Sequence, residues 1–212
     1  MLANKTVLEL LDAFSAPTPT PGGGSAAALA GAVGASLLAM VAAMPKTKTG
    51  SPESRTILDA AHATLLSLRA ELVELIDRDA AAYDEVVAAY KLPKATDTEK
   101  AARRAAVGQA MKLATDVPLE TARAAVALLR HARVVAEHGN PNAKSDAGVA
   151  ASLAMTTMTG GIMNVLTNLD GVGDAAYSAA VRNELTRITE EAAHQLGPIY
   201  AAVGWHGHTP WN

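Results

Sequence analysis

An acidic residue lies on the apolar face of a long predicted helix. Apolar side chains recur there every three or four residues, as on the buried face of a helix: Leu58, Ala61, Leu65, Leu68, Leu72 and Leu75. The same spacing next reaches Asp79, so we expect its carboxylate to point into the protein, whereas Asp77 lies about 200° away around the helix and should face solvent. An ionised carboxylate is costly to bury without a partner. Asp79 is therefore either a catalytic acid or base, or half of a structural ion pair with Arg103 or Arg104.

A glycine-rich turn comes before the first apolar helix. Residues 16–24 combine three prolines with three glycines, which is typical of a loop, and Ser25 is a suitable N-cap for the helix that follows. Free backbone N–H groups at such a helix start suit an anionic or carbonyl group of a ligand, which makes Gly23, Gly24 and Ser25 candidate binding residues. The alternative is a plain linker and cap. The turn lacks the lysine and Ser/Thr of a P-loop.

Polar residues accompany the second apolar helix. Residues 140–146 lead into it and contain Asn142 and Asp146, which are candidates at a second helix start. Asn164 and Asn168 lie four residues apart, on one face of the same helix. Buried amides need hydrogen-bond partners, and these two could read the donor and acceptor edge of a heterocycle. The alternative is hydrogen bonding between helices or between subunits.

The composition favours helices and excludes several functions. Apolar residues make up 50% of the chain and aromatic residues only 3%, so the core is mostly Ala, Leu and Val, which suits closely packed helices. A net charge of −3 and few aromatic rings argue against a nucleic-acid groove. The absence of cysteine excludes disulfides and thiol chemistry, and it fits a reducing compartment such as the cytoplasm.

Neither a metal site nor a signal peptide is expected. His206 and His208 are two residues apart in an irregular tail, with no carboxylate at a useful spacing. His131 and His138 lie near a helix C-terminus, where a cationic side chain suits the helix dipole. The N-terminal segment carries acidic residues early and has no basic stretch followed by an apolar run.

Two uncharged segments are long enough to cross a membrane, namely residues 26–44 and 147–169. Both are rich in Ala, Gly, Ser and Thr and lack aromatic or basic belts, which argues against a membrane location. We expect them to form helices that are buried all round, at the centre of a bundle or across a subunit interface. Glycines would let neighbouring backbones approach closely there: Gly31, Gly34, Gly160 and Gly161.

The pattern along the chain predicts an all-α fold. A short helix is predicted over 6–14, in addition to the two apolar helices. A long helix ends at 91–94, and the next runs from Thr96 or Asp97 to His138, with a kink or restart at Pro118. A last helix covers about 174–202. The second apolar helix is expected to begin at Ser145 or Asp146. No strand-like alternation or internal repeat is present. We predict a single-domain antiparallel helical bundle over residues 1–212.

Five segments, read in order, resemble the signatures of one known family. They are PTPGGGSAAA at 19–28, DAAAY at 79–83, LPKAT at 92–96 followed by DVPL at 116–119, NPN at 140–142 followed by SDAGVA at 145–150, and NV at 164–165 followed by Asn168. This series resembles the cyclodeaminase and methenyltetrahydrofolate cyclohydrolase family. One segment would be weak evidence, whereas five in family order, over nearly the whole chain, are specific.

The resemblance implies an all-helical fold, a homodimer as the minimal unit, and a tetrahydrofolate substrate in a cleft, with no metal or other cofactor. It places the family's catalytic aspartate on Asp79, with Asp77 as the nearby competitor. Substrate-binding roles are implied for the following residues: Gly23, Gly24, Ser25, Asn142, Asp146 and Asn164. Lys48 is also assigned to substrate, from a segment without the aromatic residue that relatives often carry there.

The resemblance implies hydrolysis of 5,10-methenyltetrahydrofolate to 10-formyltetrahydrofolate, in the cytoplasm. A buried carboxylate suits this reaction because it stabilises the amidinium cation and takes a proton from water. The first alternative is cyclodeamination of 5-formiminotetrahydrofolate, which the bifunctional relatives carry out in a domain fused to a formiminotransferase. We expect a stand-alone domain here, which favours hydrolysis. The second alternative is a non-catalytic folate-binding or scaffold dimer, with no nucleic-acid or membrane partner.

Overall fold

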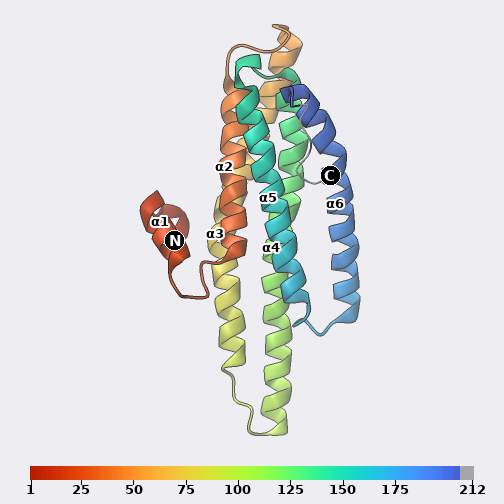
Figure 1. The fold of residues 1–212 in the computed structure, drawn as a ribbon. Helices are drawn as coiled ribbons and strands as arrows, with labels where there is room; N and C mark the ends of the chain where they lie inside the picture. The colour runs from red at the N-terminus through yellow and green to blue at the C-terminus, as the bar shows by residue number, and fades with distance from the viewer. Residues whose placement is uncertain (206–212) are drawn as a thin grey trace.

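The computed structural model describes residues 1–205, which form helices joined by short connections (Figure 1). The elements are η1 (Leu2–Asn4), α1 (Val7–Ser15), α2 (Gly23–Ala43), α3 (Pro52–Tyr90), α4 (Asp97–His138), η2 (Pro141–Ala143), α5 (Lys144–Leu169) and α6 (Ala175–Val203). No strand occurs within these described residues, which confirms the all-α prediction. The predictions for His206, His208 and the rest of the tail lie outside the described residues.

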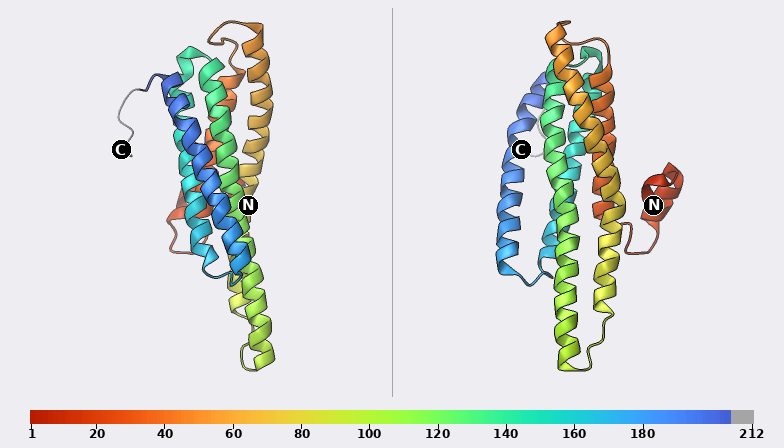
Figure 2. Two further views of the ribbon diagram at one scale, coloured as in Figure 1. Left: turned by 90° about the vertical axis from the view of Figure 1, so that its right-hand side faces the viewer. Right: turned by 180° about the vertical axis from the view of Figure 1, so that it is seen from behind.

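Helices α2 to α5 form an antiparallel bundle, and α6 packs mainly on α4 and α5 (Figures 1 and 2). Helices α3 and α4 extend past the start of α2 and the end of α5 as a projecting hairpin. Helix α1 stands away from the bundle. The predicted apolar seam of α3 is buried as expected, with Leu58, Leu65, Leu72 and Leu75 each fully inaccessible to solvent.

The two apolar helices are covered on one side only. Helix α2 and residues 141–169, which include α5, are long and apolar enough to cross a membrane, a test that core helices of soluble proteins also pass. The prediction that they are buried all round at the centre of the bundle is wrong, whereas burial across a subunit interface stays a prediction. Val33 on α2 is 45% exposed and Met163 on α5 is 62% exposed. These side chains face outward because no further helix of the bundle covers them.

The helix starts follow the expected caps only in part, since α5 begins at Lys144 rather than at Ser145 or Asp146. Thr96, one of the two predicted starts of α4, is its N-cap and forms a reciprocal capping box with Glu99. Ser25 is not an N-cap, because α2 begins at Gly23 and Gly22 occupies the cap position. Ser25 therefore lies inside the first turn, where its side chain is free to reach a neighbouring helix.

Pro118 lies within a continuous α4, which runs from Asp97 to His138 without restarting. A proline in a helix leaves the carbonyl four residues earlier without its usual donor, which here is the carbonyl of Ala114. The side-chain amide of Asn168, at the end of α5, donates a hydrogen bond to that carbonyl at 2.6 Å. A neighbouring helix thus supplies the bond that the proline removes, which explains why α4 continues through this position.

Candidate active site

Asp79 lies against the first turn of α2. A Cβ atom added to Gly24 would stand 2.1 Å from Asp79 Oδ1, so only glycine leaves room for the carboxylate at this position. Helix α3 brings Asp79 to this place because it lies four residues beyond Leu75 on the packed seam. The positive end of the α2 dipole therefore faces a carboxylate from α3.

Ser25 links Asp79 to the backbone of α3. The Ser25 side chain is fully buried, and its Oγ lies 2.9 Å from Asp79 Oδ2 and 2.9 Å from the carbonyl oxygen of Ile76. A hydroxyl has one proton, so it cannot donate to both acceptors at once. If Asp79 is protonated, its own proton can bond to Ser25 Oγ, and Ser25 then donates to Ile76. This arrangement accommodates both protonation states of Asp79.

Burial dominates the titration of Asp79. Desolvation raises the pKa of the carboxyl above its ordinary value of 3.8, while the hydroxyl and the backbone of Ser25 pull the pKa in the opposite direction by hydrogen bonding. Among the described residues, Asp79 takes part in no ion pair, and Arg103 instead donates to the backbone carbonyl of Tyr90. The ion-pair alternative with Arg103 or Arg104 is therefore wrong within the described residues.

The helical spacing predicted that Asp77 faces solvent, and this prediction is wrong. Its carboxylate accepts hydrogen bonds from the backbone N–H groups of Leu2 and Ala3 and so anchors η1 to α3. The prediction failed because the N-terminal segment folds back over this face of α3, which the local spacing in α3 does not encode. Asp77 therefore has a structural role, which argues against it as the alternative to Asp79 for the catalytic aspartate.

Asn164 completes the cluster from the α5 side. Its amide nitrogen donates to the carbonyl of Gly160 at 2.8 Å and lies 3.5 Å from the place where a Gly23 Cβ would stand. The carbonyl oxygen of the amide remains to accept a hydrogen bond from a ligand. Five predicted site residues thus meet where α2 begins: Gly23, Gly24, Ser25, Asp79 and Asn164.

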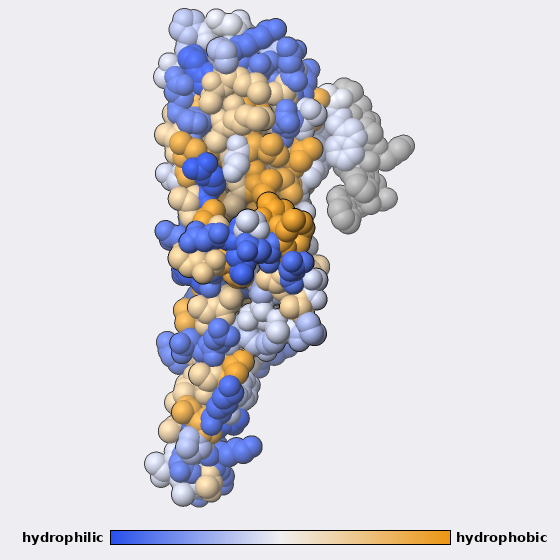
Figure 3. Space-filling view, turned by 90° about the vertical axis from the view of Figure 1, so that its left-hand side faces the viewer, coloured by the Kyte–Doolittle hydropathy of each residue, from blue (hydrophilic) through white to orange (hydrophobic). Residues whose placement is uncertain are grey.

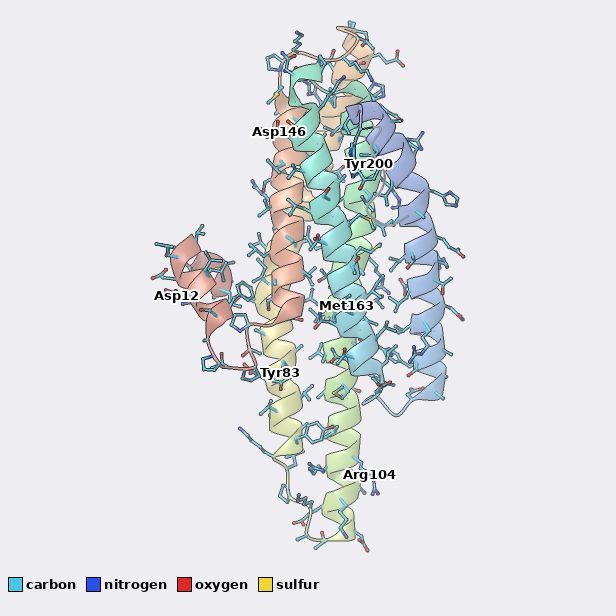
Figure 4. All side chains as sticks on the ribbon, viewed as in Figure 1. Asp12, Tyr83, Arg104, Asp146, Met163 and Tyr200 are labelled. Atoms are coloured by element: carbon cyan, nitrogen blue, oxygen red, sulfur yellow. The ribbon has the colours of Figure 1, made fainter. Side chains whose placement is uncertain are left out.

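Three predicted site residues lie elsewhere. Lys48 is in the connection between α2 and α3, and its backbone N–H donates to the carbonyl of His138. Asn142 lines a separate hollow of about 730 Å³ at the start of α5. Because α2 rises about 1.5 Å per residue, its two ends are about 30 Å apart. Figure 4 shows Asp146 near one end of the bundle and Tyr83, one turn beyond Asp79, toward the other.

The structure also brings Tyr83, which the sequence analysis gave no role, together with Asn168, which it named as a possible reader of a heterocycle. Tyr83 and Asn168 lie one turn beyond Asp79 and Asn164 respectively, and both line the same hollow of about 520 Å³ between α3, α4 and α5. Their spacing of four residues from two candidate site residues was the available signal. Among residues 1–205, no group of three or more His, Asp and Glu side chains is arranged to hold a metal ion.

Comparison with known proteins gives consistent matches. Residues 6–187 match the formiminotransferase-cyclodeaminase family. The methenyltetrahydrofolate cyclohydrolase of Methylorubrum extorquens is 40% identical over 203 residues, which cover 96% of this chain and 98% of that protein. The formimidoyltransferase-cyclodeaminase of Gallus gallus is 32% identical over 95% of this chain, which spans only 37% of that protein's length.

A solved structure shows the same arrangement of helices. The crystal structure of formiminotetrahydrofolate cyclodeaminase from Thermotoga maritima matches with a TM-score of 0.86 and 25% identity, covering 96% of this chain and 98% of that one. The family match covers most of the chain, and the 40% identity extends over almost all of a relative. The chain belongs to the formiminotransferase-cyclodeaminase family, as a homologue of its cyclodeaminase part.

Proposed function

We propose that this protein hydrolyses 5,10-methenyltetrahydrofolate to 10-formyltetrahydrofolate. The observation that carries the proposal is the partly buried Asp79 carboxylate, held by Ser25 at the start of α2. The similarity to a methenyltetrahydrofolate cyclohydrolase over 98% of that protein's length favours this reaction over others in the family. We further propose that residues 1–212 form one domain that acts in the cytoplasm.

The chemistry needs one group that accepts a proton beside a cation. The substrate is an amidinium cation whose bridging carbon joins N5 and N10. Ionised Asp79 stabilises this cation and removes a proton from the attacking water as the C–O bond forms. The tetrahedral adduct then loses its C–N5 bond as Asp79 returns its proton to N5, while the hydroxyl of the adduct gives its proton to solvent and becomes the oxygen of the formyl group on N10. One proton is released overall. The proposed reaction uses no cofactor besides the tetrahydrofolate substrate itself.

Asp79 suits both halves of this sequence because its pKa is raised by burial. A carboxylate whose pKa is raised is a stronger base toward the attacking water, and once protonated it holds that proton until N5 takes it as the C–N5 bond breaks. Ser25 keeps a hydrogen bond to Asp79 in either protonation state by changing the acceptor to which it donates. In this proposal Asn164, whose amide nitrogen lies beside Gly23, orients the substrate through its carbonyl oxygen.

Cyclodeamination of 5-formiminotetrahydrofolate is the second candidate. The fold match to a formiminotetrahydrofolate cyclodeaminase and the family match favour it. In that reaction N10 attacks the same carbon, and ammonia leaves from the tetrahedral adduct. The same carboxylate would move the protons, so the geometry of Asp79 suits both reactions.

A homodimer would bring together the predicted site residues that lie far apart in one chain. Lys48, Asn142 and Asp146 lie about 30 Å along α2 from Asp79, so they can join its site only if a second copy supplies them. The exposed apolar side chains of α2 and α5 give such a copy a surface to bury: Val33, Met40, Val149, Met163 and Leu166. Figure 3 shows apolar residues gathered across the middle of the face on the α1 side.

The two candidate reactions are separated by one pair of assays. Purified protein is mixed with 5,10-methenyltetrahydrofolate and, separately, with 5-formiminotetrahydrofolate under ammonia detection. Loss of the methenyl absorbance faster than the spontaneous rate, with no ammonia from the formimino compound, supports hydrolysis. Ammonia release supports cyclodeamination. If neither substrate reacts, the remaining account is a folate-binding or scaffold protein.

A further inference from the structure

A groove runs away from the active site along the projecting hairpin. Its walls come from α3 and α5 and its floor from α4, and it encloses about 520 Å³. The lining residues are Tyr83, Val86, Val87, Tyr90, Lys91, Met111, Ala114, Thr167 and Asn168. Helix α2 begins at Gly23 and does not extend over this stretch, which is why the space between α3 and α5 is open there.

The groove begins one helical turn from the catalytic cluster. Helices α3 and α5 run in the same direction, because each is antiparallel to α4. Tyr83 follows Asp79 by four residues on α3, and Asn168 follows Asn164 by four residues on α5. Each step is about 6 Å along the helix axis, so both walls of the groove are continuous with the site.

The α3 wall is aromatic and ends in a cation. Tyr83 and Tyr90 are 41% and 50% exposed, although the chain has only four tyrosines. They are seven residues apart, so they share a face of α3 about 10 Å apart, with Val86 and Val87 between them. Lys91 comes directly after Tyr90, at the end of the groove farthest from Asp79.

One of the two rings is held in place. The Arg103 guanidinium lies 5.2 Å from the centre of the Tyr90 ring and donates hydrogen bonds of 3.1 and 3.0 Å to the Tyr90 carbonyl. The amide nitrogen of Asn168 is engaged by the Ala114 carbonyl on the floor. The groove is therefore preorganised, which reduces the entropy lost when a ligand binds.

We propose that this groove binds the p-aminobenzoylglutamate half of the folate substrate, with its ring against Tyr83 and its glutamate carboxylates at Lys91. The inference rests on the proposed function. From the reacting carbon outward, the substrate presents N10, an apolar ring and then anionic carboxylates. The protein presents Asp79, an aromatic and aliphatic wall, and then a lysine in the same order.

The other half of the substrate suits this groove less well. A pterin carries donors and acceptors along its edge, and burying them against valine and tyrosine faces would leave them without partners. A benzoyl ring has an apolar face that stacks on tyrosine. The pterin half then falls on the other side of Asp79, where the Asn164 carbonyl oxygen and the start of α2 offer polar groups.

The test compares two substrates that differ only in the glutamate. Kinetic constants are measured with 5,10-methenyltetrahydrofolate and with 5,10-methenyltetrahydropteroate, which lacks the glutamate. We expect Lys91→Gln to raise KM for the folate by about fivefold, as an exposed ion pair allows, and to leave KM for the pteroate unchanged. Lys100→Gln is the matched control, since Lys100 lies on the same projecting hairpin, pairs with Asp97 and does not line the groove.

Equal effects of Lys91→Gln on both substrates, or no effect on the folate, would overturn the proposal. Tyr83 is tested by Tyr83→Ala, which should raise KM for both substrates, with Tyr83→Phe restoring it because the ring face is retained. If wild type turns over neither substrate, the proposed function fails. The groove is then tested by saturation-transfer NMR with p-aminobenzoylglutamate. Saturation-transfer signals in wild type that become weaker in Lys91→Gln support the groove as the binding site. The absence of such signals in wild type rejects it.

Discussion

At the scale of single residues, the site is defined by where one carboxylate can lie. Asp79 reaches the first turn of α2 because Gly24 has no side chain, and Ser25 holds it from within that turn. Burial raises the pKa of Asp79, and the hydrogen bonds from Ser25 act in the opposite direction. The consequence is a carboxyl that is easier to protonate than an exposed one.

Ser25→Ala tests the role of the hydroxyl. Removing a hydrogen bond to the ionised form makes that form less stable, so the acid-side inflection of kcat/KM moves to higher pH. At neutral pH we expect the rate to fall by about tenfold or less, the effect of one hydrogen bond to a charged group. The measurement is a pH–rate profile of both proteins. An inflection that stays in place or moves to lower pH would contradict this role.

At the scale of elements, the bundle depends on close contacts that small residues permit. A Cβ added to Gly161 on α5 would lie 2.8 Å from the carbonyl oxygen of Pro118 and 3.1 Å from the backbone nitrogen of Ala122. Neither backbone atom can move without shifting α4. The glycines of the apolar helices therefore set the spacing between helices, as the sequence suggested.

We expect Gly161→Ala to destabilise the protein by roughly 1–3 kcal/mol, because it overpacks the contact between α4 and α5. Gly148→Ala on the same helix is the matched control. Its Cβ would make only an ordinary contact of 3.8 Å, so the helix propensity of alanine should leave stability unchanged or raise it by about 0.5–1 kcal/mol. Denaturant unfolding of the two variants decides this, and equal midpoints would rule out the overpacking account.

The bond between Asn168 and Ala114 predicts an interaction between two distant positions. Asn168→Ala leaves the Ala114 carbonyl without a donor and should cost about 1–3 kcal/mol. Pro118→Ala restores a backbone N–H that can reach the same carbonyl, so Asn168→Ala should cost less in that background. A double-mutant cycle by denaturant unfolding measures the difference. Strictly additive effects would show that Asn168 does not compensate for the proline.

The elements themselves were readable from local patterns. The capping box at Thr96, the buried seam of α3 and the end of α4 at Gly139 all follow from residue types at fixed spacing. The continuity of α4 through Pro118 was not predictable from α4 alone, because the compensating donor comes from α5. Asp77 was misassigned for a similar reason, since its partners lie at the N-terminus.

The candidate site was predicted only in part. Helix periodicity placed Asp79 inward, and the glycine turn identified the helix start that meets it. The spacing of four residues did not reveal that Tyr83 and Asn168 share a groove, since that depends on how α3 and α5 lie over α4. Grouping Lys48 and Asn142 with Asp79 ignored the length of α2, which separates them in one chain.

At the scale of the whole molecule, the apolar faces of α2 and α5 predict self-association. Val33→Lys places a charge in the exposed apolar surface of α2 and should convert a dimer to monomers, with loss of activity if both copies build each site. Asn183→Lys on the exposed face of α6 is the matched control and should leave the mass unchanged. Light scattering coupled to size exclusion gives the mass. A monomeric wild type would contradict the dimer.

A shared site can also be tested by mixing variants. If Asn142 of one copy serves Asp79 of the other, refolding Asp79→Asn together with Asn142→Ala produces mixed dimers with one intact site each. Activity should then reappear in the mixture although each variant alone is inactive. A mixture that remains inactive, while mixed dimers are shown to form, would place each site within one copy.

The most direct test of the central claim compares wild type with Asp79→Asn on 5,10-methenyltetrahydrofolate, following loss of the methenyl absorbance above the spontaneous rate. We expect the variant to lose at least about 100-fold in rate because it has no proton acceptor. A carboxyl pKa raised by folding destabilises the folded state once the group ionises, so Asp79→Asn should also be as stable as wild type or more stable at neutral pH. That advantage should disappear as the pH falls toward the ordinary value of 3.8. A folded Asp79→Asn protein with wild-type activity would contradict the account.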